Sequence, residues 1–181
     1  MPPADARAGS TRTAPRLLWM LAGGLLLLRV ATGVYECRNA PQTVELVEWQ
    51  PIDQAIEQAQ LQRKPILYDF SAEWCGPCHA MAREVFADRK AASTIHGLFV
   101  PVQVVDRVRE EGRNRPDVAA LQERYKIEAF PTLIVVDPSG GEPAKVEGYP
   151  GKTALIQELT QLGVQARIQR QLGGARPDST R

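Results

Sequence analysis

The chain is poor in cysteine and has almost no net charge. Its 181 residues include three cysteines, Cys37, Cys75 and Cys78, which are too few for a small domain held together by disulfides. Lys and Arg number 22 against 21 Asp and Glu, for a formal net charge of +1. A nucleic-acid-binding protein needs a basic excess to neutralise phosphates, so we expect no nucleic acid among the partners. Internal repeats are also absent, and the length suits one domain with extra segments.

The N-terminus combines a basic stretch with a long apolar run. Residues 1–16 carry three arginines against one aspartate, and the apolar run of residues 17–34 is interrupted by Arg29. This order is typical of an export segment that leaves the N-terminus in the cytoplasm and sends the rest to the periplasm or another extracytoplasmic side. We favour a retained anchor in the inner membrane, with Arg29 reaching the interface. A cleaved signal peptide stays open, because the uninterrupted part, residues 17–28, is short for a bilayer span. A buried core helix is the third alternative, but it would leave the basic flank and the N-terminal position unexplained.

The remaining chain divides into a linker at residues 35–42, a folded domain at 43–163 and a polar flexible tail at 164–181. Apolar patterning predicts strands at residues 43–49, 66–70, 98–105, 132–136 and 145–148, and helices at 52–64, 75–90, 116–125 and 153–162. This alternation predicts an α/β fold with a central mixed β-sheet flanked by helices, and the last two strands form an antiparallel hairpin. Pro101 places its strand at an edge or a bulge, and Gly163 ends the last helix.

The strongest chemical feature is Cys75-Gly76-Pro77-Cys78, which follows an apolar strand and begins a helix. Residues i and i+3 lie on one helical face, so the two sulfurs can come within bonding range. The positive end of the helix dipole favours a thiolate at Cys75, the natural nucleophile, and Cys78 would resolve the mixed disulfide. Pro77 fits the first helical turn because it lacks an N–H, and Gly76 leaves room for a partner backbone.

Half a zinc site and a pair of buried thiols are the alternatives for these cysteines. A zinc site usually needs a second such pair or two histidines, whereas only Cys37, His79 and His96 remain. We therefore expect no metal. Cys37 is interpreted as an incidental exposed thiol, with a regulatory or dimer-forming thiol as the alternative, and His79 as an exposed helix residue that could tune the thiolate.

The string YDFSAEWCGPC at residues 68–78 closely resembles the active-site region of thioredoxin. Phe130-Pro131-Thr132, before an apolar strand, resembles that family's cis-proline loop. The resemblance covers roughly residues 43–162 and implies the thioredoxin fold and dithiol–disulfide exchange. No flavin or nicotinamide fingerprint is present, so no cofactor is expected.

The resemblance also implies roles for individual residues. Cys75 resembles the attacking cysteine and Cys78 the resolving one, with a redox-active disulfide between them. Asp69 matches the buried acid that relays the second thiol's proton; burial in an apolar strand should raise its pKa, although a structural carboxylate is the alternative. Trp74 would form an apolar wall beside the dithiol, or else simply pack in the core. The residues expected to contact substrate are Trp74, Gly76, Pro77, Phe130 and Pro131, the last with a cis peptide bond, for which an ordinary trans turn is the alternative.

Some positions depart from thioredoxin. Where thioredoxins place a lysine facing the buried acid, the matching position here is Val102, and where they kink the active-site helix with a proline this chain has Arg83. The charged loop at residues 106–117 is longer; we interpret it as solvated surface that could touch a partner. The longer loop, Lys64-Pro65 before the strand, Glu84-Val85-Phe86 after the cysteine pair and the export segment together resemble the thioredoxin-like domain of DsbD-type membrane reductants.

The predicted function is reduction of protein disulfides, because the Gly-Pro dipeptide between the cysteines matches reducing thioredoxins. The partners would be disulfide-containing proteins, the membrane through the N-terminal segment, and a membrane or thioredoxin-like electron donor. An oxidase or isomerase with the same site is one alternative. A non-catalytic binding or assembly module that uses the cis-proline groove is another.

Overall fold

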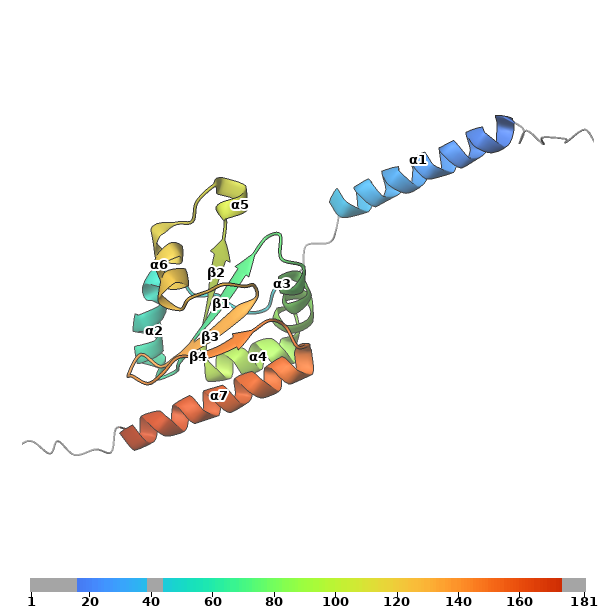
Figure 1. The fold of residues 1–181 in the computed structure, drawn as a ribbon. Helices are drawn as coiled ribbons and strands as arrows, with labels where there is room; N and C mark the ends of the chain where they lie inside the picture. Colours follow the sequence, from blue (N-terminus) through green and yellow to red (C-terminus); the bar gives the residue numbers. More distant parts are fainter. Residues whose placement is uncertain (1–15, 39–43, 174–181) are drawn as a thin grey trace, which may run out of the picture. The chain divides into compact units, whose positions relative to one another are not determined.

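A computed structural model describes residues 16–38 and 44–173 of the chain (Figure 1). The chain divides into two compact units, Met1–Gln42 and Thr43–Arg181. The described part of the first unit is the single helix α1, Arg16–Arg38. No helix in the described ranges has both the length and the apolar character needed to cross a bilayer.

Helix α1 corrects the predicted start of the linker. Residues 35–38 continue this helix, and the chain has no glycine or proline between Val34 and Pro41. The rest of the predicted linker, the basic region before Arg16 and residues 174–181 of the predicted tail lie outside the described residues. The prediction that Cys37 is an exposed thiol concerns a side chain that also lies outside the described part of the chain.

The second unit is built on a four-stranded sheet with the order β2-β1-β3-β4. The strands are β1 (Ile66–Ala72), β2 (Val100–Asp106), β3 (Thr132–Val136) and β4 (Ala144–Glu147). β1 pairs in parallel with β2 and antiparallel with β3, and β3 pairs antiparallel with β4. The predicted mixed sheet, its antiparallel hairpin and the edge position of the strand with Pro101 are confirmed.

Helices cover both faces of this sheet (Figure 1). They are η1 (Ile52–Gln54), α2 (Ala55–Gln62), α3 (Gly76–Met81), the π-helical turn η2 (Ala82–Phe86), α4 (Arg89–Leu98), α6 (Pro116–Arg124) and α7 (Lys152–Gly173). The short helix α5 (Val108–Glu111) buries no residue and lies beyond the end of β2 (Figure 1). Successive side chains of β1 point to opposite faces, so Tyr68 and Phe70 pack with α2 and α6, whereas Leu67 packs with η2, α4 and α7. Asp69 therefore points to the same face as Leu67.

The strand predicted at residues 43–49 does not form. Residues 44–50 run along the fold with isolated backbone bonds: the Leu46 N–H donates to the Phe86 carbonyl at 2.7 Å, and the Gln50 N–H to the Pro101 carbonyl at 2.8 Å. Pro101 has no N–H to return, so a regular ladder cannot continue along this edge of β2. Val47 is nevertheless buried, which explains the apolar pattern.

The helix predicted from Cys75 to Lys90 is two helical segments. α3 and η2 end at Phe86, and Asp88 then begins α4 by accepting a hydrogen bond from the Ala91 N–H at 2.9 Å. An aspartate that caps a helix in this way marks a new N-terminus. α4 was missed because its apolar positions continue directly from those of the preceding helix.

The predicted end of the last helix at Gly163 is wrong, since α7 continues to Gly173. A Cβ atom at position 163 would lie 3.0 Å from Cζ of Phe99 and 3.1 Å from Cβ of Leu98. The glycine thus permits close packing of α7 against the end of α4, inside a continuous helix. Residues 164–173, predicted as flexible tail, are helical.

Candidate active site

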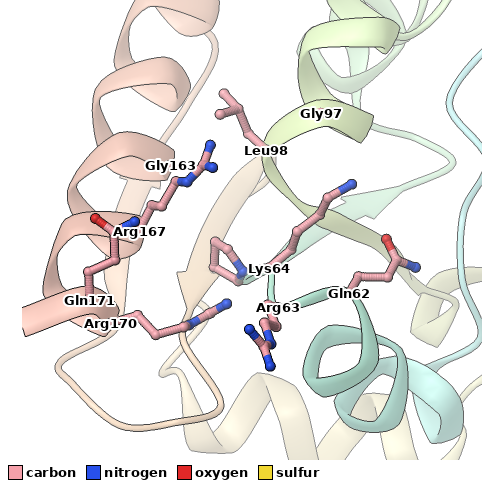
Figure 2. Close-up of a pocket in the computed structure, with 10 residues that line it drawn as sticks. Gln62, Arg63, Lys64, Gly97, Leu98, Gly163, Arg167, Arg170 and Gln171 are labelled. Atoms are coloured by element: carbon pink, nitrogen blue, oxygen red, sulfur yellow. The ribbon is translucent and has the colours of Figure 1, made fainter. Parts of the chain in front are cut away.

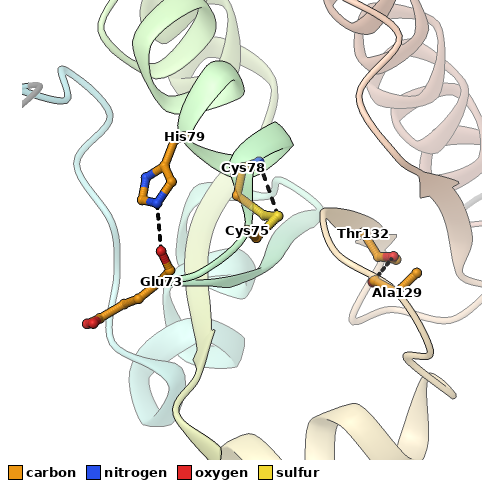
Figure 3. Close-up of a disulfide and its surroundings, with 6 residues drawn as sticks. All are labelled: Glu73, Cys75, Cys78, His79, Ala129 and Thr132. Carbon is orange, nitrogen blue, oxygen red and sulfur yellow. Dashed lines mark hydrogen bonds between the residues drawn. A yellow bond between two sulfur atoms is a disulfide. The ribbon is translucent and has the colours of Figure 1, made fainter. Parts of the chain in front are cut away.

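Cys75 and Cys78 form a disulfide at the start of α3 (Figure 3). The Sγ atoms are 2.05 Å apart and the Cα atoms 5.3 Å apart. Both residues are buried, and with Ala72 they form a small apolar cluster against which Phe130 packs. The two cysteines predicted to carry the chemistry are therefore brought together at the carboxyl end of β1.

Cys75 occupies the N-cap position of α3, before Gly76 and Pro77. Its sulfur accepts a hydrogen bond from the Cys78 backbone N–H at 3.2 Å. A thiolate at such a position is stabilised by the N–H groups that a helix leaves unpaired at its start. Pro77 lies in the first turn, where its missing N–H leaves no helical hydrogen bond unmade. The local sequence thus places the Cys75 sulfur against the backbone N–H groups at the start of α3.

Asp69 is a buried acid in the middle of β1. Its exposed fraction is 1 %, and its Oδ1 atom has no hydrogen-bond partner. Burial, followed by the nearby carboxylate of Glu45, raises its pKa from 3.8 to about 7, and a hydrogen bond from Gln103 opposes part of this rise. A carboxyl group in this state can gain and lose a proton near neutral pH.

The residue beside Asp69 on β2 is Gln103, which corrects the expectation of Val102 at this place. Asp69 is in register with Gln103, whereas Val102 is in register with Tyr68 and packs on the opposite face of the sheet. A shift of one residue along a strand moves a side chain to the other face. The buried acid therefore has an amide neighbour, which can donate a hydrogen bond without neutralising the carboxylate.

A cavity of about 250 Å³ connects Asp69 with Cys78. Its lining includes Glu45, Gln103 and His79, but not Cys75. The two cysteines thus differ in their surroundings: Cys78 faces the polar cavity of the buried acid, and Cys75 accepts the helical N–H. This asymmetry provides different proton-transfer environments for the two sulfurs.

Trp74 stands beside the disulfide as a half-exposed aromatic surface. Its exposed fraction is 44 %, which excludes a simple core position. Its ring contacts Phe130 edge to face, with centroids 5.9 Å apart, and the guanidinium carbon of Arg109 lies 3.6 Å from its centroid. The tryptophan therefore lies between α5, which follows β2, and the loop that precedes β3.

The peptide bond between Phe130 and Pro131 is cis, as the resemblance implied. This loop is held by two bonds, from Thr132 Oγ1 to the Ala129 carbonyl at 2.8 Å and from the Gly148 N–H to the Pro131 carbonyl at 2.8 Å. Figure 3 shows Ala129 and Thr132 on one side of the disulfide and the bonded pair Glu73 and His79 on the other. The fold thus brings the two predicted motifs to one site.

The sequence did not predict the contacts that bind the charged loop to this site. Arg107 forms an ion pair with Glu73 at 2.7 Å, and His79 Nε2 donates to the Glu73 carbonyl at 2.6 Å. The base of the loop is fixed by Asp106, whose Oδ2 accepts bonds from Asn114 at 2.7 Å and Gln122 at 3.0 Å. Opposite charges at positions 73 and 107 were the available signal, but nothing in the sequence placed them together.

The part of the chain that the structure describes contains no group of three or more His, Cys, Asp or Glu residues that could hold a metal ion. Cys75 and Cys78 are bonded to each other, and His79 is bonded to a carbonyl. The arrangement is suited to thiol chemistry.

Comparison with known proteins agrees with this geometry. Residues 52–163 match the model of the thioredoxin-like domain family. The chain is 35 % identical over 101 residues to a thioredoxin of Mycobacterium tuberculosis, which covers 54 % of this chain and 72 % of that protein. It is 26 % identical over 163 residues to the thiol:disulfide interchange protein DsbD of Yersinia pestis, covering 85 % of this chain and 26 % of DsbD.

Two further comparisons concern coverage and fold. The match to a bifunctional thioredoxin reductase/thioredoxin of Mycobacterium leprae also spans only 25 % of that protein, at 27 % identity and 72 % of this chain. The solved structure of a DsbH oxidoreductase superimposes with a TM-score of 0.54 at 20 % identity, over 67 % of this chain and 90 % of that one. The fold, the dithiol and these matches together show that the chain belongs to the thioredoxin-like family of thiol–disulfide oxidoreductases.

Proposed function

We propose that this oxidoreductase works outside the cytoplasm and reduces disulfides in other proteins. The observation that carries the proposal is the asymmetric dithiol, with Cys75 at a helix N-cap and Cys78 on the cavity that leads to Asp69. A site that only bound a partner would have no use for a proton acceptor beside the second sulfur. The Gly-Pro pair between the cysteines favours the reducing direction.

In the proposed reaction the reduced protein supplies two electrons. The Cys75 thiolate attacks one sulfur of a substrate disulfide, forms a mixed disulfide and expels the other substrate sulfur as a thiolate. Cys78 then loses its proton to the Asp69 carboxylate and attacks Cys75. The Cys75–Cys78 disulfide forms, the bond between Cys75 and the substrate breaks, and the second substrate sulfur leaves. The substrate ends as a dithiol and the protein as the disulfide.

Asp69 suits the second step because its pKa of about 7 lies near the pH at which the exchange operates. Proton transfer is efficient when donor and acceptor populations are comparable at the working pH. Gln103 keeps the carboxylate oriented through a hydrogen bond, and Glu45 sits close enough to hold the pKa up. The nearby cavity provides a route between the carboxyl group and Cys78.

Substrate would lie across the surface formed by Trp74, Phe130 and the cis-proline loop at Pro131. The aromatic pair next to the cysteines offers apolar contact area, and Gly76 carries no side chain that could obstruct an approaching backbone. Extended peptides are commonly bound by backbone pairing in such sites. Disulfide-containing proteins are therefore the proposed substrate class.

Export and the electron donor follow from the N-terminal segment. A basic region followed by an apolar run favours translocation of the catalytic domain, and the anchored state is the form we favour. Outside the cytoplasm the Cys75–Cys78 disulfide of a reductase must be reduced again by another protein, because the sequence has no nicotinamide or flavin fingerprint. We propose a membrane or thioredoxin-like dithiol donor. The similarity to DsbD, a thiol:disulfide interchange protein, supports this class of partner.

The mechanism is tested by trapping. The full chain with Cys78→Ser should accumulate mixed disulfides through Cys75, which mass spectrometry of reductant-sensitive complexes would identify. The matched control is the Cys75→Ser, Cys78→Ser double variant, which should trap nothing. If the single variant traps no partner, or if Cys75→Ser retains full activity in cells, the exchange mechanism fails and a binding module becomes the better explanation.

Direction and location need separate measurements. The purified chain should reduce insulin with dithiothreitol as donor faster than it refolds scrambled ribonuclease, and its redox potential should lie well below that of known oxidases. Clear oxidation without insulin reduction would instead establish the oxidase or isomerase alternative. Fractionation of cells expressing the chain, with alkaline phosphatase fused at its C-terminus, should give phosphatase activity in the membrane fraction. Activity in the soluble periplasm would indicate cleavage, and no activity would refute export.

A further inference from the structure

A basic pocket lies at the opposite end of β1 from the disulfide. It is open, has a volume of about 770 Å³, and is formed by the connection between α2 and β1, the end of α4, and α7 (Figure 2). Pro65, directly before β1, is part of its lining, whereas Cys75 follows the strand's other end. Seven residues of extended strand span about 20 Å, so the pocket is distinct from the redox site.

The lining of the pocket is strongly cationic. Arg63, Lys64, Arg167 and Arg170 contribute to it, and none of the lining residues is acidic. In Figure 2 the side chains of Arg63 and Arg170 extend toward each other from the connection after α2 and from α7. Like charges brought together repel unless an anion lies between them. The volume lies within the range of sites that bind small molecules.

Two of the four cations have structural partners. Lys64 Nζ donates to the His96 carbonyl at the end of α4, at 2.6 Å, and so uses one of its three donors. Arg170 pairs with Asp137 at 2.8 Å, outside the pocket lining. Within the described ranges, Arg63 and Arg167 have no carboxylate partner. Asp137 also lines a neighbouring cavity together with Arg63 and Arg170, and it offsets one of the four positive charges. No ion pair among the described residues offsets the other three, so the pocket keeps an excess of positive charge.

The backbone at Arg63 adds an independent observation. Arg63 follows the last residue of α2 with φ of 52°, a left-handed conformation that glycine usually provides at this place. A side chain at such a position has a conformational cost, and non-glycine residues in this region are often associated with function. Here the residue that replaces glycine supplies one of the two guanidinium groups that have no carboxylate partner among residues 16–38 and 44–173.

We propose that this pocket binds a phosphate group, either on a free phosphorylated compound or in the headgroup of an anionic lipid. Arginine forks match phosphate oxygens in bidentate geometry. A phosphate monoester carries about two negative charges, enough to offset Arg63 and Arg167 together, whereas the phosphodiester of a lipid headgroup carries one and offsets one of them. The amides of Gln62 and Gln171, which also line the pocket, can donate further hydrogen bonds. The site is separate from the dithiol and does not depend on the direction of the redox reaction.

Calorimetric titration tests the proposal with the full chain in neutral maltoside micelles. Sodium pyrophosphate is the free probe; phosphatidylglycerol mixed into the micelles, against phosphatidylcholine, is the headgroup probe. At least one phosphate probe should bind saturably at constant ionic strength. Arg167→Gln should weaken that binding about tenfold, the loss expected for one charge-assisted hydrogen bond. Arg89→Gln is the matched control: it removes an equal charge from the exposed start of α4, outside the pocket, and should leave the affinity within about twofold of wild type.

Arg63→Gly separates binding from folding. Glycine relieves the left-handed backbone and removes the guanidinium, so the variant should melt at a higher temperature yet bind the phosphate probe about tenfold more weakly. Insulin reduction should be unchanged in all of these variants, which keeps this test independent of the proposed redox function. Response to pyrophosphate alone identifies a free phosphate, and an arginine-dependent response to phosphatidylglycerol identifies a headgroup. The proposal would be overturned if neither probe bound saturably. It would also be overturned if Arg89→Gln weakened the binding as much as Arg167→Gln does.

Discussion

Replacing Asp69 with asparagine should make the oxidised protein more resistant to unfolding at alkaline pH. Asp69 has its pKa raised from 3.8 to about 7 by burial and by the Glu45 carboxylate. Between these two pH values the folded protein keeps a proton that the unfolded chain releases. The contribution of Asp69 to the free energy of unfolding therefore falls by about 1.4 kcal/mol per pH unit across this window.

The total loss follows from the width of the window. From pH 3.8 to about 7 it amounts to about 4 kcal/mol, and above that range both states are ionised, so the loss is complete. Asparagine does not titrate, so the unfolding free energy of the variant does not include this decline. The difference in unfolding free energy between Asp69→Asn and the wild type should therefore grow by about 3 kcal/mol between pH 5 and pH 9.

Urea denaturation of both proteins at pH 5, 7 and 9, without reductant, measures this difference. The disulfide remains intact, so neither cysteine titrates, and other ionisable groups cancel between variant and wild type. Glu45→Gln is an informative companion, because it keeps Asp69 but removes a neighbouring negative charge and should make the decline smaller. A difference that stays constant from pH 5 to pH 9 would refute the raised pKa and, with it, the assignment of Asp69 as proton acceptor.

Two further perturbations probe packing. Arg109→Ala should lower the unfolding free energy by no more than about 1 kcal/mol, the value of an exposed cation–π contact, and it should alter tryptophan emission. The change in emission should vanish when Trp74 is also replaced by phenylalanine. An unaltered emission spectrum would contradict the stacking. Gly163→Leu should cost about 1–3 kcal/mol in urea denaturation, because its side chain must displace Phe99. Gly97→Ala, where an added Cβ meets nothing within 4 Å, should instead stabilise α4 by up to about 1 kcal/mol, and equal effects of the two substitutions would exclude close packing as the reason for Gly163.

The catalytic motif could be predicted from sequence because its parts are local. The cysteine pair, the proline in the first helical turn and the apolar strand before them lie in one continuous stretch, so their relative positions follow from strand and helix geometry. Asp69 could be placed in the same way, since its apolar neighbours on β1 indicate burial. Pro131 required the resemblance to thioredoxin, because its approach to the disulfide depends on the fold.

The errors arose where a residue's role depends on a partner far along the chain. Glycine is the residue that most often ends a helix, so Gly163 was predicted to end the last one. In the structure it instead allows α7 to pack closely against Phe99 and the end of α4. The expectation for Val102 was wrong by one position, and the two-residue period of a strand turned that small error into the opposite face of the sheet. The stacking of Arg109 on Trp74 could not be predicted, because it joins α5 to the segment after β1, and only the folded chain brings these two together.

The complete burial of β1 has a consequence for amide hydrogen exchange. All seven residues of this strand are buried, and it is paired on both edges, with β2 and β3. Amides in such a strand exchange only when the whole domain opens, whereas those at loop tips exchange through local fluctuations. Cys75 follows the last residue of this strand by three positions and Cys78 by six. Each redox cycle therefore takes place at the border of the segment that should open last, and the slowest-exchanging amides should be the same in the oxidised and reduced protein.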